Sequence, residues 1–139
     1  DTAWRDKAEL GFSDVAGHLA QNYPSMTSLL DARLTLDNPL SIIIIGNRDG
    51  GNGEDAQASA QALANAALAH PIFCRHVIIL PPDSALDATH PAHGKQMVDA
   101  KATAYICPGQ SCLAPINTPD ALTAALDAVL DGRQTAKII

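Results

Sequence analysis

Two cysteines near the end of the chain have the spacing best suited to chemistry. Cys107 and Cys112 enclose four residues that include Pro108 and Gly109, which favour a tight turn. If the cysteines flank that turn as an opposed pair, their Cα atoms lie within roughly 7 Å and a disulfide is allowed. The spacing differs from the CxxC of thiol oxidoreductases, and buried cysteines often serve as small apolar side chains. Two interpretations therefore stand, a structural pair and a redox pair.

Two histidines that precede the cysteines raise the question of a metal site. His90 and His93, with Cys107 and Cys112, have the donor types of a zinc centre with two imidazoles and two thiolates. The Cys-x4-Cys spacing lies outside the usual separations of structural zinc ligands, and nothing in the sequence brings the histidines to the cysteines. Solvated loop histidines are the simpler interpretation, so we predict no metal.

A glycine-rich stretch between an expected strand and an expected helix has the pattern of a phosphate-binding loop. In residues 50–53, Gly51 and Gly53 fit the G-x-G-x-x-G/A pattern of dinucleotide-binding turns. Glu54 and Asp55 follow at the helix N-terminus, where their charge would repel a pyrophosphate. A surface loop is the simpler interpretation, so we predict no cofactor and keep nucleotide binding as an alternative.

The elements that must position these residues begin with two helices. Apolar residues, among them Phe12, Val15 and Leu19, recur at three- and four-residue steps across 3–22, which predicts an amphipathic helix. A Tyr-Pro-Ser break separates it from a second helical pattern. We therefore assign residues 1–38 to a helical hairpin.

Residues 39–139 have the pattern of a small α/β domain. The β-branched run 42–45 has the character of a strand buried on both faces. An Ala-rich helix and a second apolar strand follow, and the right-handed crossover rule makes the two strands parallel. We expect an α/β fold with a small mixed, mainly parallel sheet and flanking helices, Rossmann-like or thioredoxin-like in three layers. The expected strands are 40–45, 76–80, 104–107 and 112–116, and the expected helical segments are 54–70, 96–98 and 119–130, the last stopped by Gly132.

Composition argues against several classes of partner. The chain of 139 residues has 15 acidic and 9 basic residues with no Lys/Arg cluster, which disfavours nucleic acid. No apolar run approaches the roughly 20 residues that span a bilayer, so we expect no membrane partner. Three unevenly spaced cysteines favour a reducing, cytoplasmic setting. No Ser, His and Asp residues follow the pattern of a catalytic triad, and the oligomeric state is left open.

One motif near the end of the chain is specific enough to compare with known families. Residues 99–107 end in Ala-Tyr-Ile-Cys, and Cys112, Pro115 and the helix start at 118–122 follow. This order resembles the closing motif of the spermatogenesis-associated thioredoxin-like protein family. The apolar strand at 42–45 and the break between the first two helices also occur in the expected order.

The resemblance implies a longer cytosolic protein with a thioredoxin-like domain, a central (α/α)-barrel similar to those of glycosidases and sugar epimerases, and a small C-terminal α/β domain. Residues 1–38 would then be the tail of the barrel and residues 39–139 the C-terminal domain. The absence of an initiator Met agrees with a missing upstream part.

We therefore expect a non-catalytic structural or interaction domain whose partners are the upstream domains of the same polypeptide. No catalytic residue is assigned, and whether the whole protein is an enzyme is left open. The alternatives are a thiol-redox accessory that uses Cys107 and Cys112, and nucleotide binding at the loop from Gly50 to Gly53.

Overall fold

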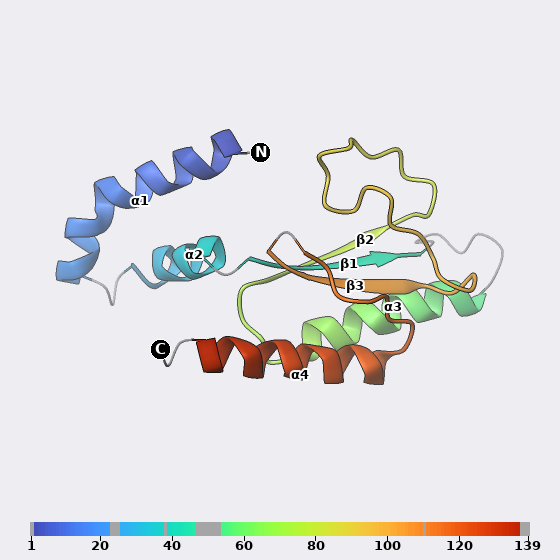
Figure 1. Ribbon diagram of the computed structural model, residues 1–139. Coiled ribbons are helices and arrows are strands. Elements are labelled where there is room, and N and C mark those ends of the chain that lie inside the picture. Colours follow the sequence, from blue (N-terminus) through green and yellow to red (C-terminus); the bar gives the residue numbers. More distant parts are fainter. Residues whose placement is uncertain (1, 23–25, 38, 47–53, 110, 137–139) are drawn as a thin grey trace. The chain divides into compact units, whose positions relative to one another are not determined.

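The chain folds into helices and strands that belong to two units, residues 1–39 and 40–139. The computed structural model describes residues 2–22, 26–37, 39–46, 54–109 and 111–136. None of the helices, over these residues, is long and apolar enough to cross a membrane. The elements are α1 (Thr2–Asn22), α2 (Thr27–Asp37), β1 (Leu40–Ile45), α3 (Glu54–Ala69), β2 (Arg75–Leu80), β3 (Thr103–Pro108) and α4 (Pro119–Ala136) (Figure 1).

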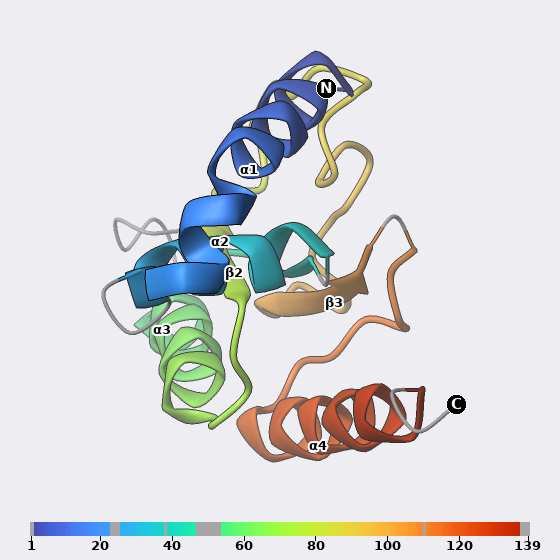
Figure 2. The ribbon, with the colours of Figure 1, turned by 90° about the vertical axis from the view of Figure 1, so that its left-hand side faces the viewer.

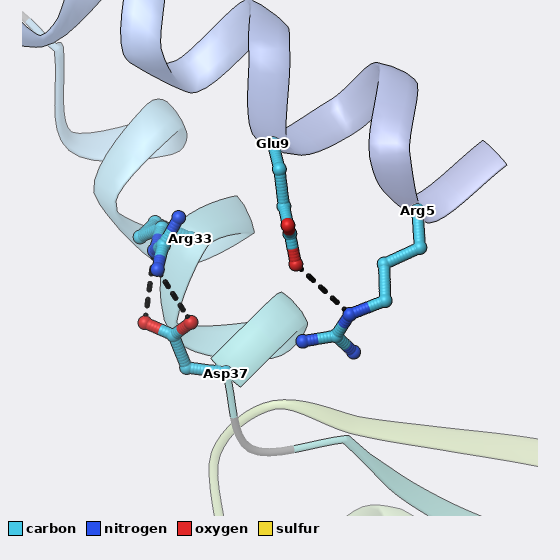
Figure 3. A network of polar contacts seen from close by, with 4 residues as sticks. All are labelled: Arg5, Glu9, Arg33 and Asp37. Carbon is cyan, nitrogen blue, oxygen red and sulfur yellow. Dashed lines mark hydrogen bonds and ion pairs between the residues drawn. The ribbon is translucent and has the colours of Figure 1, made fainter. Parts of the chain in front are cut away.

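Helices α1 and α2 make up the first unit, and the ion pairs found there stay within one helix. Arg5 Nε donates to Glu9 Oε1 at 2.9 Å in α1. In α2, Arg33 contacts both carboxylate oxygens of Asp37, at 2.9 Å from Nε and 2.8 Å from Nη2 (Figure 3). Pairs of this i,i+4 type stabilise a helix by only about 0.3–0.5 kcal/mol each. They favour the two helices but do not join them.

None of the side chains described in residues 3–37 is buried. Phe12 and Val15, which belong to the predicted apolar stripe, are half-buried, and the side chain of Leu19 lies outside the described part. Trp4 and Leu10 are 69% and 67% exposed. A hollow of about 400 Å³ lies against both helices and is lined by Glu9, Phe12, Ser13, Ala16 and Arg33. The predicted amphipathic helix forms, but its described side chains do not build a core within this unit.

A three-stranded mixed sheet, in the order β2-β1-β3, forms the centre of residues 40–139. The central strand β1 pairs parallel with β2 and antiparallel with β3, so that Ile43 lies between Ile78 and Tyr105. One pair is parallel and one antiparallel, which makes the sheet mixed but not mainly parallel. Residues 42–45 are at most 2% exposed, so the predicted burial of both faces of this strand is confirmed.

Helices α3 and α4 both cover the same face of the sheet (Figures 1 and 2). Ile42 of β1 packs there in one cluster with Leu63 of α3 and Leu122 of α4. The approach of α3 is close: a Cβ added at Gly46 would lie 2.9 Å from the Cβ of Ala60, so glycine is required at this point. Among the side chains described in residues 60–69 of α3, the buried ones recur at the spacing of one helical face: Ala60, Leu63, Ala64 and Ala67.

Helix α4 begins where the sequence predicts and ends later. Thr118 Oγ1 accepts a hydrogen bond from the Ala121 N–H at 3.4 Å, and Pro119 is the first helical residue. The predicted stop at Gly132 is wrong, because α4 continues to Ala136. A glycine inside a helix costs about 1 kcal/mol but keeps its N–H donor, so it weakens the helix without ending it.

The connection 81–102 covers the other face of the sheet (Figure 1). Leu86, Ala92 and Met97 of this connection pack in one cluster with Ile43 of β1. In the described part of this unit the second face is therefore covered by coil and turns, whereas helices lie on the first face alone.

The helical segment predicted at 96–98 is wrong, because residues 96 and 97 have no regular structure and Val98 begins a tight turn. The Lys101 N–H donates to the Val98 carbonyl oxygen at 3.0 Å, and the residues between them, Asp99 and Ala100, have φ angles of 53° and 56°. Two successive positive φ angles are typical of a type I′ hairpin turn. Such a turn has no signature in the spacing of apolar residues, so the pattern of this polar connection does not reveal it.

The second strand of the predicted hairpin forms only a single bridge. Ala104 and Ile116 exchange two backbone hydrogen bonds, at 2.7 and 3.0 Å, and the Leu113 N–H donates to the Ile106 carbonyl oxygen at 2.8 Å. Ala104 and Ile106 are two residues apart on β3, whereas their partners Ile116 and Leu113 are three residues apart on the returning chain. The returning chain therefore has one extra residue here, which is a β-bulge. Pro115 lies inside it and has no N–H to donate, so a continuous ladder does not form.

Candidate functional site

Cys107 and Cys112 form a disulfide, and their Cα atoms are 3.9 Å apart. Leu113 and Ile106 are opposite each other and share a backbone hydrogen bond. Hydrogen-bonded and non-hydrogen-bonded pairs alternate along an antiparallel hairpin, so the next pair, Cys107 and Cys112, is a non-hydrogen-bonded one. Such pairs have the shorter Cα separation, about 4.5 Å in antiparallel ladders. The hairpin thus brings the two sulfur atoms together whatever their function.

The two ends of the disulfide differ in exposure. Cys107 is 2% exposed and packs in one cluster with Ile43 and Ile45, and its Sγ lies 3.9 Å from the Tyr105 carbonyl oxygen. Cys112 is exposed. Thiol–disulfide exchange begins with attack of a thiolate on an accessible sulfur. A reductant can therefore reach Cys112, and Cys107 would be the leaving thiol.

The structure gives His90 a structural contact and leaves His93 exposed. His90 Nδ1 accepts a hydrogen bond from the Ala92 N–H at 3.1 Å, and the His93 N–H donates to the His90 carbonyl oxygen at 2.9 Å. Cys107 and Cys112, joined to each other, present no thiolate to a metal. Within the described ranges, no group of three or more His, Cys, Asp or Glu side chains is placed to hold a metal ion.

The glycine-rich loop lies outside the described residues. This holds for Gly51 and Gly53 and for the whole loop from Gly50 to Gly53, while α3 begins directly after it at Glu54. The hypothesis of nucleotide binding there thus rests on the sequence pattern alone.

A buried histidine that sequence reasoning missed links α3 to α4. His70 is 5% exposed, and its Nδ1 accepts a hydrogen bond from the Ile72 N–H at 3.2 Å. This acceptor role places the ring proton on Nε2, which then donates to Asp127 Oδ1 at 3.0 Å. Both ring nitrogens are engaged, so His70 serves as a link between helices. The two partners are 57 positions apart, and no local pattern signals such a pair.

Arg75 caps the C-terminal end of α3, the end that His70 follows. Its guanidinium donates to the carbonyl oxygens of Leu68 and Ile72. A positive charge beside the last carbonyl groups of a helix is favourable, because those groups carry the negative end of the helix dipole. The Arg75 side chain is therefore part of the helix terminus.

A second polar network fixes the turn before β3. Thr103 is fully buried, and its Oγ1 donates to the Lys101 carbonyl oxygen at 2.9 Å and accepts from the Val98 N–H at 2.8 Å. Asn117 Nδ2 donates to Thr103 Oγ1 at 2.9 Å and also reaches the carbonyl oxygens of Val98 and Ala102, at 3.3 and 3.2 Å. These bonds satisfy buried polar atoms and leave the network a structural role.

Comparison of the sequence with protein-family models, curated proteins and solved structures finds no match. The resemblance to the spermatogenesis-associated thioredoxin-like family therefore stands as an expectation drawn from the motif at 99–122. By its geometry, the disulfide permits thiol–disulfide exchange, whereas His70 and Thr103 are committed to structural bonds.

Proposed function

We propose that this chain is a non-catalytic structural or interaction domain of a larger cytosolic protein, as the family resemblance implies. The observation that carries the proposal is the first unit, in which none of the described side chains of 3–37 is buried. Isolated short helices are marginal in water, and most helix stability in proteins comes from packing an apolar face. Two helices without a core bury too little surface to offset the entropy of ordering them.

The apolar side chains of α1 and α2 therefore require a covering surface. Trp4, Leu10 and Leu34 are 69%, 67% and 45% exposed, and full burial of such a side chain contributes about 1.5–3 kcal/mol. The ion pairs within the helices contribute far less, about 0.3–0.5 kcal/mol each. The proposed cover is the upstream part of the same polypeptide, whose helical barrel α1 and α2 would complete.

For residues 40–139 we propose a small version of a three-layer α/β domain, Rossmann-like or thioredoxin-like, in which one layer is not helical. The parallel unit β1-α3-β2 supports the assignment. Helices α3 and α4 make one layer and the sheet the second, while the connection 81–102 takes the place of the third.

Substitutions at the exposed apolar positions test the interaction role. Trp4→Gln and Leu10→Gln should each lower the melting temperature of the longer natural polypeptide, by roughly 2–4 °C per kcal/mol lost. In the isolated chain the same variants should have little effect, because these side chains are exposed there. Asp6→Asn, also exposed on α1, is the matched control and should be neutral in both. Unchanged melting of the longer polypeptide in both Gln variants would contradict the proposal.

The disulfide favours a second candidate function, a thiol-redox accessory. A dithiol reductant, in this proposal the upstream thioredoxin-like domain, would attack Cys112 Sγ as a thiolate and displace Cys107, which takes up a proton. The second thiol of the reductant then resolves the mixed disulfide and releases Cys112 as a thiol. Two electrons and two protons pass to this chain, and the reductant becomes a disulfide.

A double variant, Cys107→Ser with Cys112→Ser, separates the redox role from the structural one. If the pair is structural, the variant of the longer protein loses stability, because a hydroxyl replaces sulfur at the buried Cys107 site, and it keeps any activity that the protein has. If the pair is a redox site, thiol-dependent activity disappears while stability under reducing conditions changes little. Thiol titration with and without reductant gives the redox state directly.

A further inference from the structure

A cavity of about 300 Å³ lies at the carboxyl ends of the parallel strands β1 and β2. Ile45 and Leu80, the last residues of these strands, both line it. In open α/β sheets, ligands bind in the crevice outside the carboxyl ends of the strands. The volume is also at the lower end of the range for small-molecule sites, about 300–1,000 Å³. Position and size therefore both suit a small ligand.

The floor of the cavity is apolar and well packed. Ile45, Leu80, Leu86 and Ala92 line it and belong to the cluster that fills the second face of the sheet. Ile45 and Ala92 are 2% and 1% exposed. The end of β1 is fixed to β2 here, because the Gly46 N–H donates to the Leu80 carbonyl oxygen at 2.9 Å. The apolar surface that a ligand can touch therefore comes from Leu80 and Leu86, which are half-buried.

The described residues at the rim of the cavity are polar and carry no negative charge. His93, Lys95 and Gln96 contribute an imidazole, an ammonium and an amide, and no Asp or Glu is among the described residues that line the cavity. The hydroxyl of Ser84 already donates to the Pro81 carbonyl oxygen at 2.8 Å. In a chain with 15 acidic and 9 basic residues, a concave surface with a lysine and without carboxylates favours an anion.

The backbone around Lys95 is held in place before any ligand arrives. Its Nζ lies 5.1 Å from the centroid of the Tyr105 ring, and its backbone N–H donates to the Ala92 carbonyl oxygen at 3.1 Å. The Tyr105 hydroxyl in turn donates to the Gln96 carbonyl oxygen at 2.7 Å. Gly94, with a φ of 73°, provides the left-handed residue that this turn needs. A backbone fixed in this way loses little entropy on binding.

We propose that this cavity binds a small organic anion that joins one phosphate or carboxylate group to a compact apolar body. The apolar part rests on Leu80 and Leu86, which lie over the buried Ile45 and Ala92, and Lys95 receives the anionic group at the rim with His93 beside it. The site lies wholly within residues 40–139, so it does not depend on the interaction role proposed for the helices of the first unit.

Amide NMR titrations of the full chain test the site with simple probes. Phenyl phosphate and benzoate distinguish the two anionic groups, benzyl alcohol keeps the ring without the charge, and inorganic phosphate keeps the charge without the ring. We expect resonances of residues 84–96 to shift with phenyl phosphate or benzoate, and benzyl alcohol and inorganic phosphate to bind at least about tenfold more weakly. No shift in this segment with either aromatic anion, or equal affinity for benzyl alcohol, would overturn the proposal.

Variants locate the binding. Lys95→Gln should weaken binding of the aromatic anion that binds more tightly, phenyl phosphate or benzoate, by about tenfold or more. Lys95→Arg should retain most of the affinity, because it keeps the positive charge. Ala85→Trp, a change at an exposed residue of the lining, should block the cavity while the resonances of β1 stay in place. Lys101→Gln is the matched control, because Lys101 is exposed and lies outside the lining. Equal weakening by Lys101→Gln and Lys95→Gln, or no effect of Lys95→Gln and Ala85→Trp, would refute the site.

Discussion

We expect the connection 81–102 to exclude water from the second face of the sheet as completely as the helices do on the first, and the substitution Ile43→Ala tests this. Ile43 is 0% exposed and packs under the connection in one cluster with Ala92 and Met97. The substitution removes three carbon atoms, or about 2.4 kcal/mol at about 0.8 kcal/mol for each buried methylene. The cavity that remains adds to this loss, so we expect a total of about 2–5 kcal/mol. Ile44→Ala should cost a similar amount, because Ile44 is equally buried under α3 and α4.

Urea denaturation of the full chain, followed by far-UV circular dichroism, gives the free energy of unfolding for each variant. Leu68→Ala is the matched control: it also removes three carbon atoms, but from a side chain of α3 that is 56% exposed, so its effect should stay within about 0.5 kcal/mol. If Ile44→Ala costs the full amount while Ile43→Ala is as mild as Leu68→Ala, the connection does not seal the second face of the sheet, and the reasoning fails.

Three further substitutions test individual contacts by the same denaturation measurement. Ala100→Gly should stabilise the protein by about 0.5–1 kcal/mol, because the φ of 56° suits glycine; a loss of stability would contradict the type I′ turn. Asn117→Ala should cost about 1–3 kcal/mol, because Thr103 and the carbonyl groups beside it lose their donor; a neutral result would show that water replaces the amide. Gly46→Ala should cost about 1–3 kcal/mol through contact with Ala60, and Ala60→Gly should recover part of that loss; additive effects would rule out the contact.

Local sequence signals predicted the elements that the chain specifies locally. The β-branched run at 42–45 gave a fully buried central strand, and the Thr-Pro-Asp start gave the first residue of α4 at Pro119. The spacing of Cys107 and Cys112 predicted their proximity, although it could not tell whether they are bonded. In each case the deciding residues are neighbours in sequence.

Features held by distant residues could not be predicted in this way. The turn at Asp99 and Ala100 contains no glycine, and a network from Thr103 and Asn117 holds the residues around it. The link from His70 to Asp127 spans 57 positions. The cavity at the ends of β1 and β2 combines the ends of two strands with a later connection, so its composition appears only after folding.

Amide hydrogen exchange tests the central claim, that α1 and α2 depend on a cover outside this chain, most directly. In the isolated chain, we predict that amides of residues 3–37 exchange with little protection, whereas those of 42–45 are protected by the full stability of the sheet, because none of the described side chains of 3–37 is buried. In a longer polypeptide that includes the proposed upstream part, residues 3–37 should gain at least about tenfold protection, equivalent to about 1.4 kcal/mol. Protection of 3–37 in the isolated chain equal to that of 42–45, or no gain in the longer polypeptide, would contradict the claim.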